Sequence, residues 1–203
     1  MTDRRRLYQR IAPFYDILDF AGEALNQRRV RPQIFDGLSG CVLDAGVGTG
    51  RNIPFYPSSA SIVGSDLSNA MLRRAIRRRQ RLGAPLSIVA SNICQSPFPD
   101  NSFDAAVATF LFCVLDDADQ LPALRELARI CRTGGEIRLL DYVLPEHARR
   151  RRSAYLMAPL LRFLFGASVE RNTEQYVTAA GLTVVERRLV AGDYCRLLVL
   201  RHA

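Results

Sequence analysis

CVLDAGVGTG, residues 41–50, is the stretch that decides the fold. Its first three residues are an apolar run typical of a buried strand in a parallel sheet. Asp44, followed by three glycines at alternate positions, ends that run in a tight turn. Glycine has no Cβ, so the backbone can adopt positive φ and bring its N–H groups close to a small molecule. The dinucleotide fingerprint is not met, because Arg51 stands where a glycine is needed. The stretch therefore predicts a turn that binds a nucleoside.

An acidic residue ends the next predicted strand, residues 61–66. Asp66 lies 20 residues after Gly46, the offset at which a carboxylate can accept hydrogen bonds from both hydroxyls of a ribose. A helix over residues 69–81 is expected to follow. A glycine-rich turn alone could be a simple connection between a strand and a helix. Together with Asp66, it predicts a ligand that contains an unphosphorylated ribose.

The motifs VLDAGVGTG (42–50) and VGSDLSNAML (63–72) carry a family resemblance. With them the sequence resembles the class I S-adenosylmethionine-dependent methyltransferases, and PFPDNSFDAAVATF (97–110) and RELARICRTGGEIRLLD (125–141) extend the resemblance. Within that superfamily it looks most like the bacterial phospholipid (phosphatidylethanolamine) N-methyltransferases. The resemblance implies an α/β, Rossmann-like fold with a mostly parallel seven-stranded sheet, helices on both faces and an antiparallel C-terminal hairpin. It also implies S-adenosyl-L-methionine as cofactor and S-adenosyl-L-homocysteine as product.

The resemblance also implies the residues that hold the cofactor. A tyrosine near residues 12–16 would cap the methionine end, Asp66 would hold the ribose, and the loop after the third strand would lie beside the adenine. The alternatives are a buried structural tyrosine and a turn-forming asparagine. The implied cofactor-binding set is Tyr8, Tyr15, Asp44, Gly46, Gly48, Gly50, Asp66, Leu67, Met71, Asn92, Ile93 and Phe110.

The acceptor is indicated by residues 109–113, TFLFC, at the expected carboxyl end of the fourth strand. Many class I enzymes have Asn-Pro-Pro-Tyr there, whereas this apolar sequence favours an aliphatic or lipid-like acceptor and supplies no general base. Methyl transfer mainly requires in-line positioning, but an amine acceptor must first lose a proton. Four residues are candidates for that step, and the sequence does not choose among them: Tyr15, Asp141, Tyr142 and His147.

The remaining patterns predict secondary structure along the rest of the chain. Gly134 and Gly135 are expected to end the helix predicted over residues 120–131. Helices are expected over residues 27–35, 120–131 and 173–180, strands over 86–90, 103–110 and 136–143, and a hairpin over 182–189 and 194–201.

Composition predicts a single domain over residues 1–203, 48% of which are hydrophobic. No run of apolar residues is long enough to span a membrane, and the first residues lack the apolar core of a secretory signal, so a cytoplasmic location is expected. The five cysteines form no C-x-x-C pair. They are expected to be reduced thiols, with no metal site.

The charge pattern predicts an anionic partner. The net charge is +8, and all 28 basic residues are arginines, whose planar fork holds phosphate in a bidentate way. Residues 1–35 are expected to form an amphipathic helical cap. Residues 148–166 place four arginines before an apolar, aromatic-rich run, which indicates an interfacial segment. The alternatives are a surface helix packed on the sheet and a core helix with basic flanks.

These patterns favour methyl transfer to the amine of a membrane phospholipid headgroup, phosphatidylethanolamine and its methylated intermediates. The enzyme would act at the anionic inner face of the membrane as a peripheral protein. The alternative is a methyltransferase for a quinone precursor, a thiol or another small molecule. A nucleic-acid-binding protein ranks lowest, because the arginines are not interleaved with aromatic residues in a known RNA-binding module.

Overall fold

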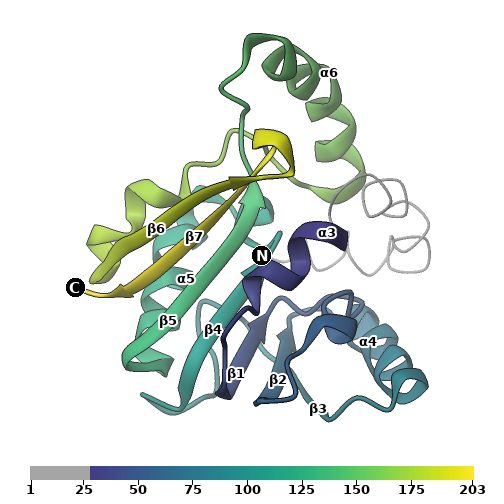
Figure 1. Ribbon diagram of the computed structural model, residues 1–203, viewed down its shortest axis with the longest axis vertical. Coiled ribbons are helices and arrows are strands. Elements are labelled where there is room, and N and C mark those ends of the chain that lie inside the picture. Colours follow the sequence, from purple (N-terminus) through teal and green to yellow (C-terminus); the bar gives the residue numbers. More distant parts are fainter. Residues whose placement is uncertain (1–27) are drawn as a thin grey trace.

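The computed structural model describes residues 28–203, which form a sheet with helices packed against it (Figure 1). Tyr8, Tyr15 and most of the predicted cap lie outside the described residues. The seven strands lie in the spatial order β3-β2-β1-β4-β5-β7-β6. They are β1 (Gly40–Ala45), β2 (Ala60–Asp66), β3 (Leu86–Ala90), β4 (Phe103–Thr109), β5 (Cys131–Tyr142), β6 (Leu182–Val190) and β7 (Cys195–His202).

The pairing of the strands confirms the predicted Rossmann-like sheet. β3, β2, β1, β4 and β5 pair in parallel, and β7 pairs antiparallel with both β5 and β6. The chain moves outward from β1 to β3 and then returns to β4, on the other side of β1. Ligands in such sheets bind in the crevice outside the carboxyl ends of the strands, where this direction reverses. A site is therefore expected where β1 and β4 end.

The two faces of the sheet are covered by different helices. Leu43 and Ala45 pack with α5 (Asp117–Ile130), in which Leu124 and Leu127 are fully buried. Val42 points to the other face, where α3 (Arg28–Val30) and η2 (Arg31–Ile34) cover it (Figure 1). This alternation follows the twofold period of a strand.

Helix α4 (Asn69–Leu82) packs against β2 and β3. Ser68 caps its first turn, and the backbone N–H of Met71 donates to the Ser68 hydroxyl. Gly83 ends the helix in a left-handed conformation. Met71, Leu72 and Ala75 are buried and Ile76 is half-buried, whereas the arginines of the helix are exposed or half-buried.

The helix predicted over residues 120–131 ends within one residue of its expected end, but the role expected for Gly134 and Gly135 was wrong. α5 ends at Ile130, and β5 begins directly at Cys131, which pairs with Phe103. Gly134 and Gly135 therefore lie inside β5. A Cβ on Gly135 would lie only 2.6 Å from the backbone oxygen of Asp104. This glycine allows a close approach of two strands, which the sequence pattern alone cannot distinguish from a helix end.

Two other predicted helices were also wrong in type. Residues 173–180 form the 3-10 turns η5 (Thr173–Tyr176) and η6 (Thr178–Ala180). In the region of residues 27–35, α3 gives way to the 3-10 turn η2, with Pro32 in its first turn. The other short turns are η3 (Ile53–Phe55), η4 (Phe112–Val114) and η7 (Ala191–Asp193).

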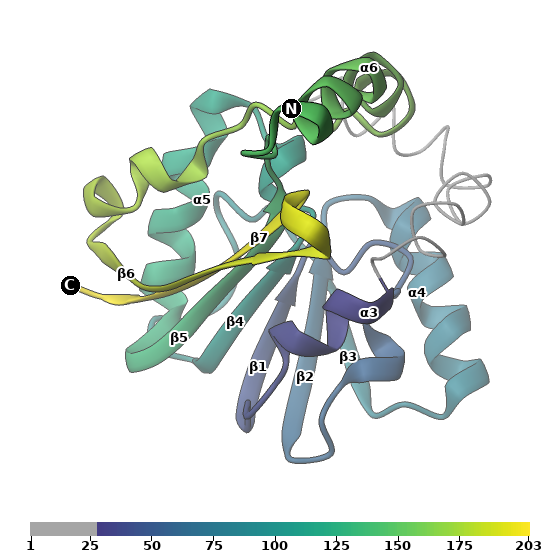
Figure 2. The same cartoon turned by 45° about the horizontal axis from the view of Figure 1, so that its top comes forward.

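Helix α6 (Ala148–Phe165) follows β5 and lies at the end of the molecule toward which β5 runs (Figures 1 and 2). It corresponds to the predicted basic and apolar segment. Within residues 28–203, no helix combines the length and the apolar character that crossing a bilayer requires.

Candidate functional site

A cavity of about 150 Å³ opens where β1, β2 and β4 end, at the expected crevice. Asp44 and Gly50 are not among its lining residues. Tyr8 and Tyr15 lie outside the described part of the chain. The residues from the predicted cofactor-binding set that line it are Gly46, Gly48, Asp66, Leu67, Met71, Asn92, Ile93 and Phe110.

The glycine turn after β1 lines one side of this cavity. Gly46 has φ of 73°, and its N–H donates to the Ser65 oxygen at 2.8 Å. A Cβ on Gly46 would lie 3.0 Å from Cδ1 of Leu111, so the turn is packed closely against the segment after β4. Gly50 has a different role, since a Cβ there would lie 2.5 Å from Cδ1 of Ile53.

The carboxylate of Asp66 is held by the backbone on both sides. Its Oδ2 accepts from the N–H of Gly48 at 3.0 Å, and its Oδ1 accepts from the N–H of Ser68 at 2.7 Å. The side chain remains partly exposed to the cavity. Burial raises the pKa of this carboxyl above its ordinary value, although the backbone hydrogen bonds oppose the rise. A fixed acceptor is thereby aimed into the cavity before any ligand arrives.

Asp44 lies behind the cavity wall and is fully buried. Nδ2 of Asn52 donates to both of its carboxylate oxygens, at 3.1 and 3.0 Å, and the hydroxyl of Tyr56 donates to Oδ2 at 2.6 Å. Burial raises the pKa of Asp44 to about 6 against the hydrogen bonds from Tyr56 and Asn52. Of these three residues only Asn52 lines the cavity. Asp44 therefore does not line the cavity itself, and it is linked to the cavity wall through Asn52.

Asn52 connects the two strands at the crevice. Its Nδ2 also donates to the hydroxyl of Thr109 at 3.1 Å, and its Oδ1 accepts from Nη1 of Arg31 at 2.9 Å. Asn52, Thr109 and Arg31 are all buried and all line the cavity. One amide thus ties the turn after β1 to the end of β4 and to a buried guanidinium.

Phe110 forms a strained aromatic part of the wall. Its φ of 55° is unusual for a residue with a side chain and costs about 1 kcal/mol. Its ring centroid lies 4.7 Å from that of Tyr142, and Cζ of Arg31 lies 5.2 Å from the Phe110 centroid. The left-handed backbone turns the ring into this stack, where a cation and an aromatic ring attract each other.

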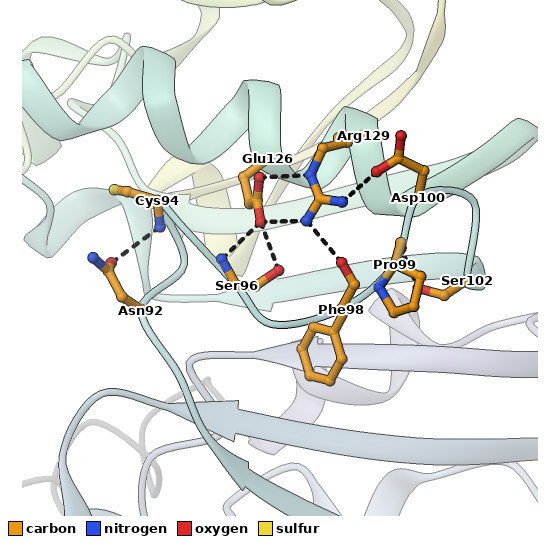
Figure 3. A network of polar contacts seen from close by, with 9 residues as sticks. All are labelled: Asn92, Cys94, Ser96, Phe98, Pro99, Asp100, Ser102, Glu126 and Arg129. Carbon is orange, nitrogen blue, oxygen red and sulfur yellow. Dashed lines mark hydrogen bonds and ion pairs between the residues drawn. The ribbon is translucent and has the colours of Figure 1, made fainter.

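The loop that carries Asn92 and Ile93 is fixed from outside the cavity by an ion pair on α5 (Figure 3). Oε1 of Glu126 accepts from both the N–H and the hydroxyl of Ser96, each at 2.7 Å. Arg129 binds Glu126 and donates to the backbone oxygen of Phe98 at 2.8 Å. Hydrogen bonds from Arg129 and Ser96 lower the pKa of Glu126 to about 2 despite burial.

Asn92 itself is part of a turn. Its Oδ1 accepts from the N–H of Cys94 at 3.0 Å (Figure 3). This is the turn geometry that the sequence left open as an alternative. Since an amide oxygen has two lone pairs, Oδ1 can still accept from a ligand in the cavity.

The predicted proton acceptors that lie in the described residues are dispersed. Asp141 and Tyr142 line a second, much smaller cavity next to Arg171 and Arg196. Asp141 accepts from the N–H of Cys113 at 3.0 Å, and burial raises its pKa to about 7. His147 is exposed at the N-terminus of α6 and lines neither cavity. Tyr142 lies nearest to the large cavity, through its stack with Phe110.

Sequence reasoning missed several residues of the cavity wall. Asn52 could have been found, because a polar residue directly after a glycine turn is a natural partner for Asp44. Arg31 gave no local signal, since it lies in a different element and reaches the site only through the fold. The wall residues outside the predicted set include Arg31, Thr49, Asn52, Ser68, Leu111, Val114, Leu115 and Asp119.

The arrangement can bind a molecule with both polar and apolar parts. Asp66 offers a fixed acceptor for hydroxyl groups, and the turn after β1 brings backbone close to the ligand. Leu111, Val114 and Leu115 form an apolar wall. Pockets of this kind, with few polar groups in a mostly apolar surround, bind small organic ligands.

The sequence model of a family described as a methyltransferase domain matches residues 42–135. Among solved structures, a SAM-dependent methyltransferase from Aquifex aeolicus has the same fold. Its TM-score is 0.62 at 21% identity, and the match covers 90% of this chain and 96% of that one.

Two curated proteins are similar in sequence. A phosphatidylethanolamine N-methyltransferase from Cereibacter sphaeroides is 33% identical over 139 residues, which cover 68% of this chain and 66% of that protein. A demethylmenaquinone methyltransferase from Paenarthrobacter aurescens (strain TC1) is 29% identical over 181 residues, which cover 86% of this chain and 68% of that protein. The chain therefore spans about two thirds of the length of these relatives.

Proposed function

The chain belongs to the class I S-adenosylmethionine-dependent methyltransferases, and from this premise we propose that it transfers a methyl group to the amine of a phospholipid headgroup. The observation that carries the cofactor part of the proposal is the Asp66 carboxylate, which two backbone N–H groups hold in the cavity wall. The acceptor part is supported by the apolar wall of Leu111, Val114 and Leu115. A quinone precursor, a thiol or another small molecule is the second candidate for the acceptor.

The cavity residues fit the cofactor. Asp66 would accept hydrogen bonds from the ribose hydroxyls, and the turn at Gly46 and Gly48 would lie against the methionine end. Asn92 and Ile93 would lie beside the adenine. A side chain on Gly46 would press on Leu111 and narrow the cavity, which agrees with a backbone that must stay close to its ligand. When bound, S-adenosylmethionine supplies an electrophilic methyl group on a sulfonium centre.

The protein's own contribution is mainly positioning and exclusion of water. The Asp44, Asn52 and Thr109 network is buried and fixes the crevice without offering a base to the cavity. Holding the acceptor in line supplies most of what a methyl transfer needs. The proton of an amine acceptor would be taken, directly or by way of water, by one of the four candidates Tyr15, Asp141, Tyr142 and His147.

The wall and the relatives support the proposed acceptor class. Leu111, Val114 and Leu115, which follow β4, are apolar and carry no amide or carboxylate that would orient a nucleobase. The relative from Cereibacter sphaeroides is named for a phospholipid amine, which favours that acceptor. The relative from Paenarthrobacter aurescens is named for a quinone precursor, so the same apolar wall keeps the second candidate open.

The test is a competition between acceptors. The full chain is incubated with methyl-labelled S-adenosylmethionine, vesicles that contain phosphatidylethanolamine, and a demethylated quinone. Label in N-methylated lipid supports the proposal, and label confined to the quinone establishes the second candidate instead. Asp66→Ala serves as the control and should abolish labelling of every acceptor. If S-adenosylhomocysteine does not bind in calorimetry, the cofactor assignment itself is wrong.

A further inference from the structure

Helix α6 carries a row of exposed side chains that the cavity does not use. Arg149, Arg152, Leu156 and Leu160 follow one another at intervals of three, four and four residues, so they lie along one side of the helix. All four are exposed, and Leu156 is 81% exposed. The row is about 16 Å long at 1.5 Å per residue. Its first half is basic and its second half is apolar.

The start of α6 is fixed to the body of the protein by the other two arginines of the cluster. Arg150 pairs with Asp193 at 2.9 Å and donates to the backbone oxygen of Gly192. Arg151 donates to the backbone oxygen of Pro145 at 3.0 Å. Ala154 is buried on the inner side of the helix. The exposed row is therefore presented at a defined orientation.

This orientation relates the row to the cavity. α6 follows β5 at its carboxyl end, and the cavity opens at the carboxyl ends of the parallel strands β1, β2 and β4. Figures 1 and 2 both show α6 at that end of the sheet. The row is thus carried by an element at the same end of the sheet as the cavity.

We propose that this row, defined by Arg149, Arg152, Leu156 and Leu160, docks the protein on an anionic phospholipid surface. Arginines bind the phosphates at the surface, and leucines enter the boundary between headgroups and acyl chains. With both on one side of one helix, the helix lies tilted in the interface, its apolar half deeper than its basic half. Tyr155 and Met157 flank the row and are 49% and 47% exposed, which widens the apolar half.

A second copy of the chain fits this row less well than lipid does. α6 contains no acidic residue. In an antiparallel contact between two copies, the arginines of one row would lie against the leucines of the other, and in a parallel contact arginine would face arginine. Both arrangements bury guanidinium groups without an acidic partner, which is unfavourable. Lipid phosphate supplies the missing charge.

Docking extends the proposed function, and the delivery of a lipid acceptor to the cavity rests on that function. Binding to vesicles is measured without cofactor or methyl transfer. The full chain is sedimented with vesicles of phosphatidylglycerol and phosphatidylethanolamine, and with phosphatidylcholine vesicles as the neutral reference. Binding to the anionic vesicles that weakens with salt is expected. The double variants Leu156→Ser/Leu160→Ser and Arg149→Gln/Arg152→Gln should each lose at least about tenfold in partitioning.

Two matched variants are the controls. Val185→Ser/Leu189→Ser removes exposed apolar side chains from β6, and Arg73→Gln/Arg77→Gln removes two exposed arginines from α4. Both should bind within about threefold of the parent. Equal losses of partitioning in the control and α6 variants would overturn the proposal, because net charge or non-specific hydrophobic contact would then explain binding. Sedimentation velocity tests for a dimer of the parent. A dimer that dissociates only in the α6 variants would assign the row to a second copy instead.

Activity separates failure of docking from failure of the proposed function. On a short-chain, monomeric phosphatidylethanolamine, Leu156→Ser/Leu160→Ser should retain the parent's turnover, whereas on vesicles it should fall in parallel with partitioning. An equal loss on both forms of lipid would contradict a docking role. If the parent methylates neither form but binds vesicles through the row, the docking surface stands and the acceptor assignment is wrong.

Discussion

The N–H of Gly48 donates to Oδ2 of Asp66 at 3.0 Å, so the turn after β1 and the carboxylate at the end of β2 form one unit. The two residues are 18 positions apart in the chain. Their contact explains why a glycine turn and a later acidic residue act as one motif. The turn positions the acid, and the acid in turn holds the backbone of the turn. A change at either residue is therefore expected to affect nucleoside binding.

Replacing Asp66 tests this unit directly. Asp66→Ala removes the proposed acceptor for the ribose hydroxyls and the partner of the Gly48 N–H. Hydrogen bonds to a charged group contribute about 1.5–3 kcal/mol each, so affinity for S-adenosylhomocysteine should fall by about 100-fold or more. Isothermal calorimetry measures this change. Asp36→Ala, which removes an exposed carboxylate, should leave the affinity unchanged. Equal affinities for the two variants would show that the ribose is held elsewhere.

The second prediction concerns the packing of the glycine turn. Gly46 and Gly83 both have positive φ, 73° and 62°, but only at Gly46 would a Cβ meet other atoms, those of Leu111. Alanine at either position strains the backbone by about 1–2 kcal/mol. Gly46→Ala should cost a further 1–3 kcal/mol or so through overpacking and should also weaken cofactor binding. Urea denaturation and calorimetry on both variants check this, and equal stabilities would contradict the close contact with Leu111.

The parts of the fold that local sequence determines could be predicted. β3 was predicted at its observed bounds, and β2, β4 and α4 each to within one residue, because apolar runs and glycines mark those ends. The glycine turn and Asp66 were predicted because both belong to one short motif. The start of β5 could not be predicted, since two glycines mark either a helix end or a close approach of strands.

Residues brought to the site by tertiary structure could not be predicted in the same way. Arg31 precedes β1 and reaches Asn52 and Phe110 only once η2 packs on the sheet. The positive φ of Phe110 is imposed by its surroundings, because no sequence preference places an aromatic residue there. Asp44 was expected near the ligand, and its burial by Asn52 and Tyr56 depends on contacts with two later residues.

The Glu126 ion pair should stabilise the loop next to the cavity. Glu126→Gln removes the charge that binds Arg129 and Ser96, so we expect a loss of about 1–3 kcal/mol at neutral pH and severalfold weaker cofactor binding. Since the pKa of Glu126 is lowered to about 2, its contribution is present above its ordinary value of 4.5 and is lost as the pH falls through about 2. The stability difference between parent and variant, measured in urea, should therefore shrink below pH 4.5.

An exposed glutamate provides the matched control for this change. Oε1 of Glu186 lies 3.5 Å from Nε of Arg188, and the side chains of Glu186 and Arg188 are 52% and 45% exposed. Such surface pairs contribute little, so Glu186→Gln should change stability by less than about 0.5 kcal/mol and leave cofactor affinity unaffected. A loss as large as that of Glu126→Gln would mean that net charge, rather than the contacts of Glu126, controls the stability.

Asp141 is expected to make the folded state less stable as the pH rises. Burial raises its pKa from 3.8 to about 7, although Arg196 and the N–H of Cys113 favour its charged form. A carboxyl with a raised pKa stabilises the fold fully below its unfolded value, and this stabilisation is lost as the pH rises through about 7.

Asp141→Asn keeps an oxygen for the Cys113 N–H but cannot ionise. Because a pKa change of one corresponds to about 1.4 kcal/mol, the rise from 3.8 to about 7 predicts that the variant is more stable than the parent at pH 8 by roughly 4 kcal/mol, and the two should converge below pH 4. Thermal unfolding between pH 4 and pH 8 measures this difference, and a constant offset would mean that the pKa of Asp141 is not raised in the folded protein. Turnover of the same variant addresses the chemistry separately. If Asp141 accepts the proton of an amine acceptor, turnover is lost while stability rises, and if it has only a structural role, turnover at pH 8 is retained.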